Sequence, residues 1–157
     1  MIPTLKIFTE KEKKELIEKL EEQFGIKEIQ GLVTMFGAER MFLFQGNMGA
    51  KEIQELQNLI YLERVGIYFA KEQNDQIRLS MEGVYVLKNQ ITKNIFELNK
   101  EQAEEWMLGQ ELPIKTGTKE FLVMKYGEYF LGCGKASEEK IGNFIPKNRR
   151  LKYKESG

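Results

Sequence analysis

Two apolar runs with a short turn between them limit the fold more than any other feature of this sequence. The runs are 121–125 and 129–131, and the turn is Tyr126-Gly127-Glu128. Alternating apolar residues on either side of a glycine-containing turn predict a β-hairpin. Directly after it, the segment from Lys140 to Lys154 has six basic residues and no acidic one. We therefore expect the C-terminal part to combine a sheet with a positively charged segment, which on its charge alone is either a phosphate-binding, RNA-contacting segment or a solvated tail.

The composition indicates a folded, soluble protein with little catalytic equipment. The 157 residues are 41% hydrophobic, enough for one sizeable core or two small ones. The 24 basic and 24 acidic residues cancel, so a partner must be inferred from where the charges lie. The sequence has no histidine, which removes the commonest general base and metal ligand. The single cysteine, Cys133, suits a reducing cytoplasm, and neither a membrane span nor an export signal is expected.

The first 62 residues predict a small α+β unit. Thr9 and Glu12 form a capping box, so a helix is expected over about 10–24. Two β-branched and aromatic runs, 31–36 and 40–44, predict a hairpin. Apolar residues at helical spacing then predict a second helix over about 49–60.

The remaining residues, 63–157, read as many short strands with two short helices. Strands are expected at 64–71, 76–79 and 94–98, and the first helix at 81–88, capped by Ser80, with Gly83 unfavourable inside it. Asn99 is expected to cap the second helix, which ends at Gly109. This pattern predicts a small, partly open β-barrel, packed directly against residues 1–62 because no flexible linker separates them.

Several segments from Asn94 onward carry a resemblance to a known family. They are Leu98 with Glu101-Gln102-Ala103, Leu108-Gly109-Gln110, Phe121-Leu122-Val123, Leu131-Gly132-Cys133-Gly134-Lys135, and Gly142 to Lys147 with Arg149 or Arg150. Together they resemble the C-terminal PUA-like domain of Sun-family, RsmF-type RNA cytosine-5 methyltransferases. The resemblance implies an RNA-binding pseudobarrel for 63–157, preceded by an added N-terminal α+β domain in 1–62.

The sequence departs from that family in two ways. The family's Gly-Trp-Gly-Lys appears here with Cys133 in place of the aromatic residue, so stacking by that side chain is lost. No Pro-Cys pair is present, and the chain has no room for the family's S-adenosylmethionine-binding domain. The resemblance thus implies a stand-alone RNA-binding relative that is not an enzyme.

The glycines around Cys133 and the cysteine itself have two readings each. Gly132, Gly134 and Gly142 either admit a phosphate close to the backbone or mark bulges in a tight barrel, and the second reading is favoured. Cys133 beside Lys135 suggests a nucleophile, but without histidine a small buried core residue is favoured. Trp106 is expected in the core.

The function expected from the sequence is non-catalytic binding of structured RNA, either rRNA or tRNA, in ribosome biogenesis or RNA modification. The predicted RNA contacts are Lys135, Lys140, Asn143, Lys147, Arg149, Arg150 and Lys152. No cofactor, metal or DNA partner is expected. An alternative is a protein-interaction adaptor that supplies an RNA-binding module to a separate RNA methyltransferase or assembly factor.

Overall fold

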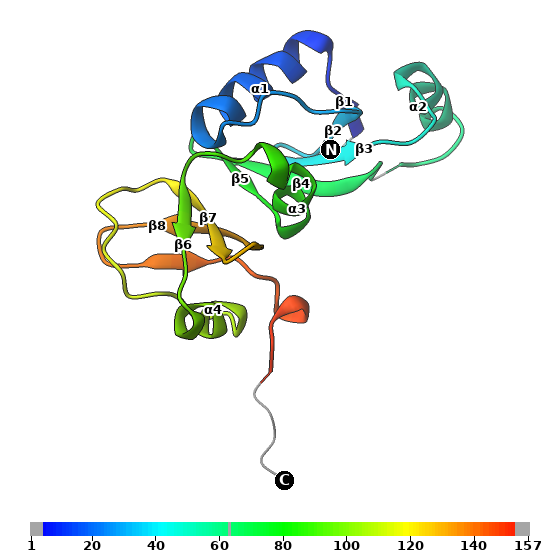
Figure 1. Ribbon diagram of the computed structural model, residues 1–157. Helices are drawn as coiled ribbons and strands as arrows, with labels where there is room; N and C mark the ends of the chain where they lie inside the picture. Colours follow the sequence, from blue (N-terminus) through cyan, green and yellow to red (C-terminus); the bar gives the residue numbers. More distant parts are fainter. Residues whose placement is uncertain (1–4, 63, 153–157) are drawn as a thin grey trace.

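The computed structural model describes residues 5–62 and 64–152, which form two sheets with helices packed against them (Figure 1). The first sheet is antiparallel, in the order β1 (Leu5–Ile7), β2 (Leu32–Phe36), β3 (Arg40–Phe44), β4 (Ile67–Gln73) and β5 (Gln76–Leu79). The second contains β6 (Ile95–Glu97), β7 (Phe121–Tyr126), β8 (Tyr129–Ala136) and β9 (Ile141–Asn143), with only β6 and β7 parallel. The α-helices are α1 (Glu10–Phe24), α2 (Ala50–Gln57), α3 (Met81–Leu87) and α4 (Lys100–Met107), and the 3₁₀ turns are η1 (Lys88–Gln90) and η2 (Lys147–Arg149). The expected α+β class is confirmed.

Helix α1 begins and ends where its capping residues predict. The Thr9 hydroxyl accepts a hydrogen bond from the Glu12 amide at 3.1 Å, and the Glu12 carboxylate accepts one from the Thr9 amide at 3.0 Å. Gly25 follows the helix with φ +81°, the left-handed conformation that favours glycine. Between the caps, Leu16, Leu20 and Phe24 face the first sheet and are buried.

The first sheet continues past the expected domain boundary. Strands β4 and β5 pair with β3, although 63–79 was expected in the second unit. An apolar alternating run predicts a strand but does not say which sheet the strand joins, because pairing is a long-range property. The change of sheet instead occurs between β5 and β6. The division into domains 1–62 and 63–157 stays a prediction.

The short helix α3 packs so closely on β4 that it needs glycine at one position. The Ser80 hydroxyl caps it by accepting from the Gly83 amide at 2.9 Å. A Cβ at Gly83 would lie 2.0 Å from the Phe69 carbonyl oxygen. Gly83, unfavourable for a helix by propensity alone, is therefore required for helix–strand contact.

Strand β7 has both faces buried and joins the two halves. Phe121 and Val123 belong to a core shared with α1 and the first sheet, whereas Leu122 and Met124 belong to a second core around Trp106 of α4. The period of two in a strand produces this alternation. The indole of Trp106 is fully buried and donates to the Leu131 carbonyl at 2.6 Å, so its expected core position is confirmed.

Helix α2 covers one end of the opposite face of the first sheet through Ile53, which packs with Leu5 and Val65 in a third small cluster. Across residues 5–62 and 64–152, no helix is both long and apolar enough to cross a bilayer.

Candidate nucleic-acid interface

The predicted basic segment is fixed along the C-terminal end of α4. The Leu151 amide donates to the Met107 carbonyl at 2.7 Å. Further back, Leu112 and Ile141 exchange backbone hydrogen bonds of 2.8 and 3.1 Å. The segment therefore has a defined path on the second sheet, which positions each of its side chains.

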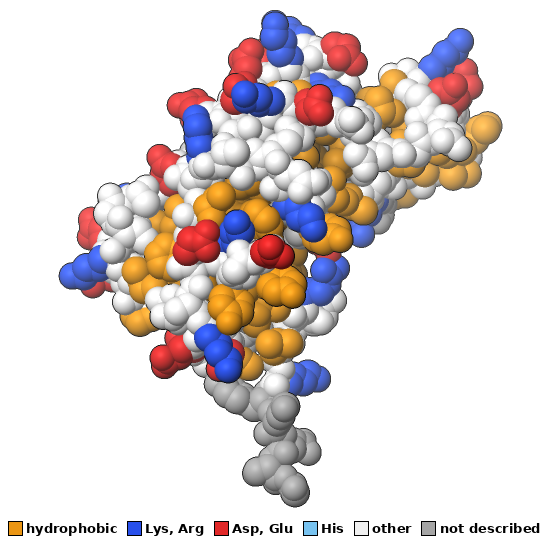
Figure 2. Space-filling model, in the orientation of Figure 1, with side chains coloured by type: hydrophobic (Ala, Val, Ile, Leu, Met, Phe, Trp, Pro, Cys, Tyr) orange, Lys and Arg blue, Asp and Glu red, His pale blue; other side chains and the backbone are white. Residues whose placement is uncertain are grey.

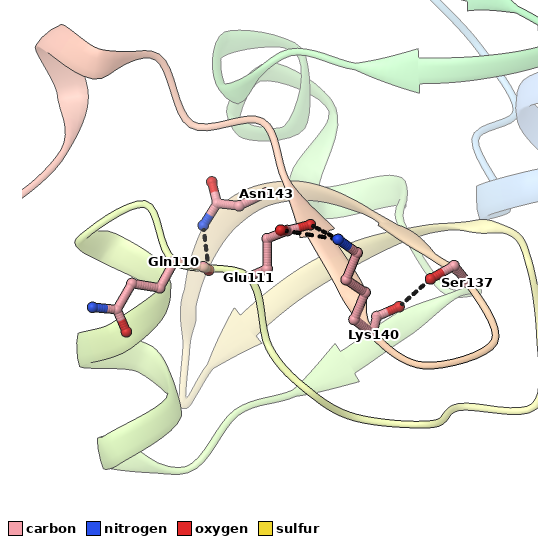
Figure 3. Close-up of polar contacts among 5 residues, drawn as sticks. All are labelled: Gln110, Glu111, Ser137, Lys140 and Asn143. Carbon is pink, nitrogen blue, oxygen red and sulfur yellow. Dashed lines mark hydrogen bonds and ion pairs between the residues drawn. The ribbon is translucent and has the colours of Figure 1, made fainter.

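Asn143 holds this segment to the end of α4. Its amide nitrogen donates to the Trp106 carbonyl at 2.9 Å. It also donates to the Gln110 carbonyl at 3.0 Å (Figure 3). Its amide oxygen accepts from the Ile145 amide at 2.8 Å. The Trp106 carbonyl lies in the last turn of α4, where it also accepts from the Gly109 amide at 2.9 Å, and Gln110 follows the helix. The side chain acts as a clasp, and its expected hydrogen bond to RNA stays a prediction.

The side chain of Arg150 is also held by contacts within the protein. Its Nε donates to the Ile145 carbonyl at 2.9 Å. Its side chain also lies against Gly109, where an added Cβ would come within 2.4 Å of Cδ and Nε. Gly109, expected as a helix stop, has φ +90° and also leaves space for this arginine.

Lys140 and Arg149 are exposed but paired with carboxylates. Lys140 Nζ lies 2.9 and 3.0 Å from the two carboxylate oxygens of Glu111, at the turn that joins β8 and β9 (Figure 3). The Arg149 guanidinium contacts the Glu82 carboxylate of α3. All four side chains are between one third and about one half exposed. Such pairs are weak in water, so a phosphate can displace the carboxylate.

Lys135 is directed into the junction between the two sheets. Its ammonium donates to the Gln76 side chain of β5 at 3.0 Å and to the Lys119 carbonyl, and it lies 4.7 Å from the centre of the Phe121 ring. A phosphate contact at Lys135 would have to replace these contacts.

Lys147 and Lys152 are the predicted cations most available to a ligand. Both are exposed, and within the described ranges neither ammonium has a hydrogen bond or ion pair. Lys147 begins η2, which follows Pro146. Figure 2 shows one face of the molecule, on which blue and red side chains are interspersed around a hydrophobic area, so no large block of one charge is visible there.

Cys133 is a core residue rather than a nucleophile. It is 3% exposed, and burial raises the pKa of its thiol to about 12, although Arg78 and Lys135 oppose the shift. A thiol with this pKa is almost fully protonated at neutral pH. In the described residues, no group of three or more Cys, Asp or Glu side chains is arranged to hold a metal.

The neighbouring glycines serve packing. A Cβ at Gly134 would lie 2.7 Å from Trp106 Cη2 and 2.8 Å from Ile141 Cγ2, and Gly132 has φ +87°. Gly134 and Gly132 are therefore explained by close packing and backbone conformation, in line with the structural role favoured from the sequence. At Gly142, the nearest atom to an added Cβ is 3.6 Å away, so packing places no such demand there.

Sequence reasoning missed Arg78 of β5. Its guanidinium lies 4.0 Å from the centre of the Phe144 ring, in the same C-terminal segment as the predicted cations. A small pocket of about 70 Å³ beside them is lined by Tyr68 of the first sheet, Cys133 of the second and Glu82 of α3, among others. Residues 78 and 144 are too far apart in sequence for a local pattern to connect them.

Comparison with known proteins gives matches to one kind of protein. The family model described as "Methyltransferase RsmF PUA domain" matches residues 93–151. The ribosomal RNA small subunit methyltransferase F of Shewanella oneidensis is 28% identical over 100 residues, which cover 62% of this chain and 21% of the relative. That of Aeromonas salmonicida is 26% identical over 140 residues, covering 87% of this chain and 28% of the relative. The chain spans less than a third of the length of these curated relatives.

The longer alignment extends well beyond the matched domain. At 140 residues it necessarily includes most of the chain before residue 93. The Aeromonas relative therefore aligns with most of the residues before 93 as well, and the expectation that residues 1–62 form an added domain stays a prediction. The resemblance expected from the sequence is itself confirmed: residues 93–151 match the PUA domain of RsmF-type methyltransferases.

Proposed function

We propose that this protein binds structured RNA through the C-terminal segment of its PUA-like region, without catalysing a reaction itself. The observation that carries the proposal is the match of residues 93–151 to the RsmF PUA domain, in a region that presents exposed cations along one anchored segment. Both relatives are named as methyltransferases of small-subunit ribosomal RNA, which favours rRNA over tRNA as the target.

The contacts fall into two groups within this proposal. Lys147 and Lys152 meet phosphates directly, because their ammonium groups are exposed and have no competing partner in the described part of the chain. Lys140 and Arg149 join them by exchanging a carboxylate for a phosphate. Arg150, Asn143 and Lys135 act mainly by holding the segment in place.

Absence of catalysis is proposed from the residues themselves. The sequence has no histidine, and its one thiol is buried with a raised pKa. The protein is therefore expected to affect rRNA maturation or modification by binding alone, in the cytoplasm, where ribosomal RNA is found.

The test is the double variant Lys147→Glu with Lys152→Glu, measured against small-subunit ribosomal RNA at several salt concentrations. Each lost phosphate contact should lower the slope of log affinity against log salt by about 0.7 to 0.9, so the double variant should lose roughly 1.4 to 1.8. The matched control is Lys11→Glu with Lys14→Glu, two exposed lysines of α1. An equal slope in wild type and the tail variant, or equal loss in the control, would refute the assignment.

A second candidate function, the adaptor, has one observation in its favour. The end of α2 and the residues after it expose large apolar side chains: Leu59 is 81%, Tyr61 61% and Ile60 53% exposed. Figure 2 shows hydrophobic atoms on this projecting part at the upper right. Such patches mark protein contacts. A pull-down after nuclease treatment, comparing wild type with Leu59→Glu plus Ile60→Glu, would support the adaptor if an RNA methyltransferase is lost only with the variant.

A further inference from the structure

The outer face of the first sheet carries a row of basic side chains formed by strand register. Arg40 of β3 is the register partner of Lys71 of β4, which is in turn the partner of Arg78 of β5. Their neighbours Met41, Ala70 and Ile77 point to the buried side, toward α1. Because side chains alternate along a strand, the three cations lie side by side on the face away from α1. We call these three residues the outer row.

Aromatic rings accompany this row. The guanidinium of Arg40 lies 5.4 Å from the centre of the Tyr68 ring, and Arg64 lies 5.4 Å from that of Phe42. Phe42 and Tyr68 are themselves register partners with ring centres 5.9 Å apart. The two guanidinium groups thus lie within cation–π distance of a pair of neighbouring rings, and Arg40 and Arg64 are exposed to solvent.

The outer row is continuous with the C-terminal segment. Arg78 lies over Phe144, and Tyr68, Arg78, Phe144 and Pro146 line one pocket at the junction of the two sheets. Pro146 immediately precedes Lys147, and Arg149 is held to Glu82 of the same pocket wall. These contacts place the C-terminal segment directly beside Arg78, the end of the outer row that lies nearest the second sheet.

The kind of cation on this surface is informative. Only five of the 24 basic residues in the chain are arginines, and three of them are Arg40, Arg64 and Arg78. In the described residues, none of these three has a carboxylate at salt-bridge distance, and Lys71 has one, Glu39 at 3.2 Å. Arginine differs from lysine in having a planar group that stacks on a ring on one side and on an unpaired base on the other, while its edge bonds phosphate.

We propose that the outer row, with Arg64 and its aromatic platform, is a second RNA-binding surface that takes single-stranded or looped nucleotides and extends the C-terminal site onto the first sheet. This inference rests on the proposed function, since it deepens the same RNA contact. It gives the first sheet a part in RNA binding, although the residues of that sheet lie before the matched region, 93–151.

The test compares four proteins in binding to small-subunit ribosomal RNA and to an unstructured single-stranded RNA of about 20 nucleotides. They are wild type, Arg40→Gln with Arg78→Gln, Arg40→Lys with Arg78→Lys, and Lys147→Glu with Lys152→Glu. The glutamine pair should weaken binding at least about tenfold and lower the salt slope by about 1.4, because two phosphate contacts are removed. The lysine pair should keep the salt slope and lose affinity for the single strand, because charge remains and stacking is lost. Circular dichroism and melting temperature check that each variant is folded.

The outcomes separate the two proposals. If the Lys147 and Lys152 variant loses affinity while both Arg40 and Arg78 variants bind like wild type, the outer row is an internal brace and the inference is overturned, with the proposed function intact. If the glutamine pair loses affinity and the tail variant does not, the outer row binds RNA by itself, and both the C-terminal site and the statement that the row extends it are overturned. Wild-type protein that binds neither RNA overturns both proposals.

Discussion

Replacing Asn143 by alanine should destabilise the protein rather than remove an RNA contact. The side chain makes three hydrogen bonds, of 2.8 to 3.0 Å, two of which are partly buried and one of which is exposed. At about 1 kcal/mol for each partly buried bond and about half that for the exposed one, Asn143→Ala should cost about 2 to 3 kcal/mol. For a chain of this length, that corresponds to a fall in melting temperature of roughly 5 to 10 °C.

The assay is thermal and urea unfolding followed by circular dichroism, with RNA affinity measured well below the transition. Asn143→Asp should be worse than Asn143→Ala, because a carboxylate would face the carbonyl oxygens of Trp106 and Gln110. Asn148→Ala is the matched control, since Asn148 lies exposed in η2 and should change stability by less than about 0.5 kcal/mol. Unchanged stability in Asn143→Ala together with lost RNA affinity would refute the clasp and restore Asn143 as a direct reader of RNA.

Two further predictions concern the region around β8. Cys133 should resist alkylation in the native protein at pH 8 and react at once in urea, because burial raises the pKa of its thiol to about 12; rapid native labelling would contradict its burial. The thiol ionises near its ordinary pKa of 9.0 in the unfolded chain, but only near 12 in the folded protein. The contribution of Cys133 to the free energy of unfolding should therefore be complete below pH 9 and fall as the pH rises toward 12. Urea titrations of Cys133→Ala should not show this loss. Gly134→Ala should lower the free energy of unfolding by about 1 to 3 kcal/mol, because the added Cβ would meet Trp106 and Ile141. Gly142→Ala is the control and should be nearly neutral by the same urea titration, because the nearest atom to its Cβ is 3.6 Å away. Equal effects of the two substitutions would show that close packing is not the reason for Gly134.

Local chemistry explains which parts of the fold could be predicted from the sequence. Thr9, Ser80 and Asn99 each cap a helix with a partner three residues away, so the signal is contained within one turn. Asn74 and Asp75, which join β4 to β5, have positive φ angles, a conformation that asparagine and aspartate tolerate in turns. These elements were located to within a few residues.

Long-range pairing explains what could not be predicted. Nothing near β4 and β5 in sequence indicates that they join β3 rather than the second sheet. The same limit applies to the site. The sequence shows that 140–152 is basic, but it does not show that Asn143 and Arg150 contact the C-terminal end of α4, more than thirty residues earlier in the chain. The outer row was invisible because residues 40, 71 and 78 become neighbours only through strand register.

Because β7 packs against both sheets, it also determines which part of the chain can fold as a separate fragment. Phe121, Val123 and Cys133 from the family-matched region pack in a single cluster with residues of α1 and the first sheet. A fragment cut at residue 93 would expose one whole side of β7 to water and melt or aggregate. The unit that folds as one piece is thus longer than residues 93–151, in agreement with the 140-residue alignment to one relative.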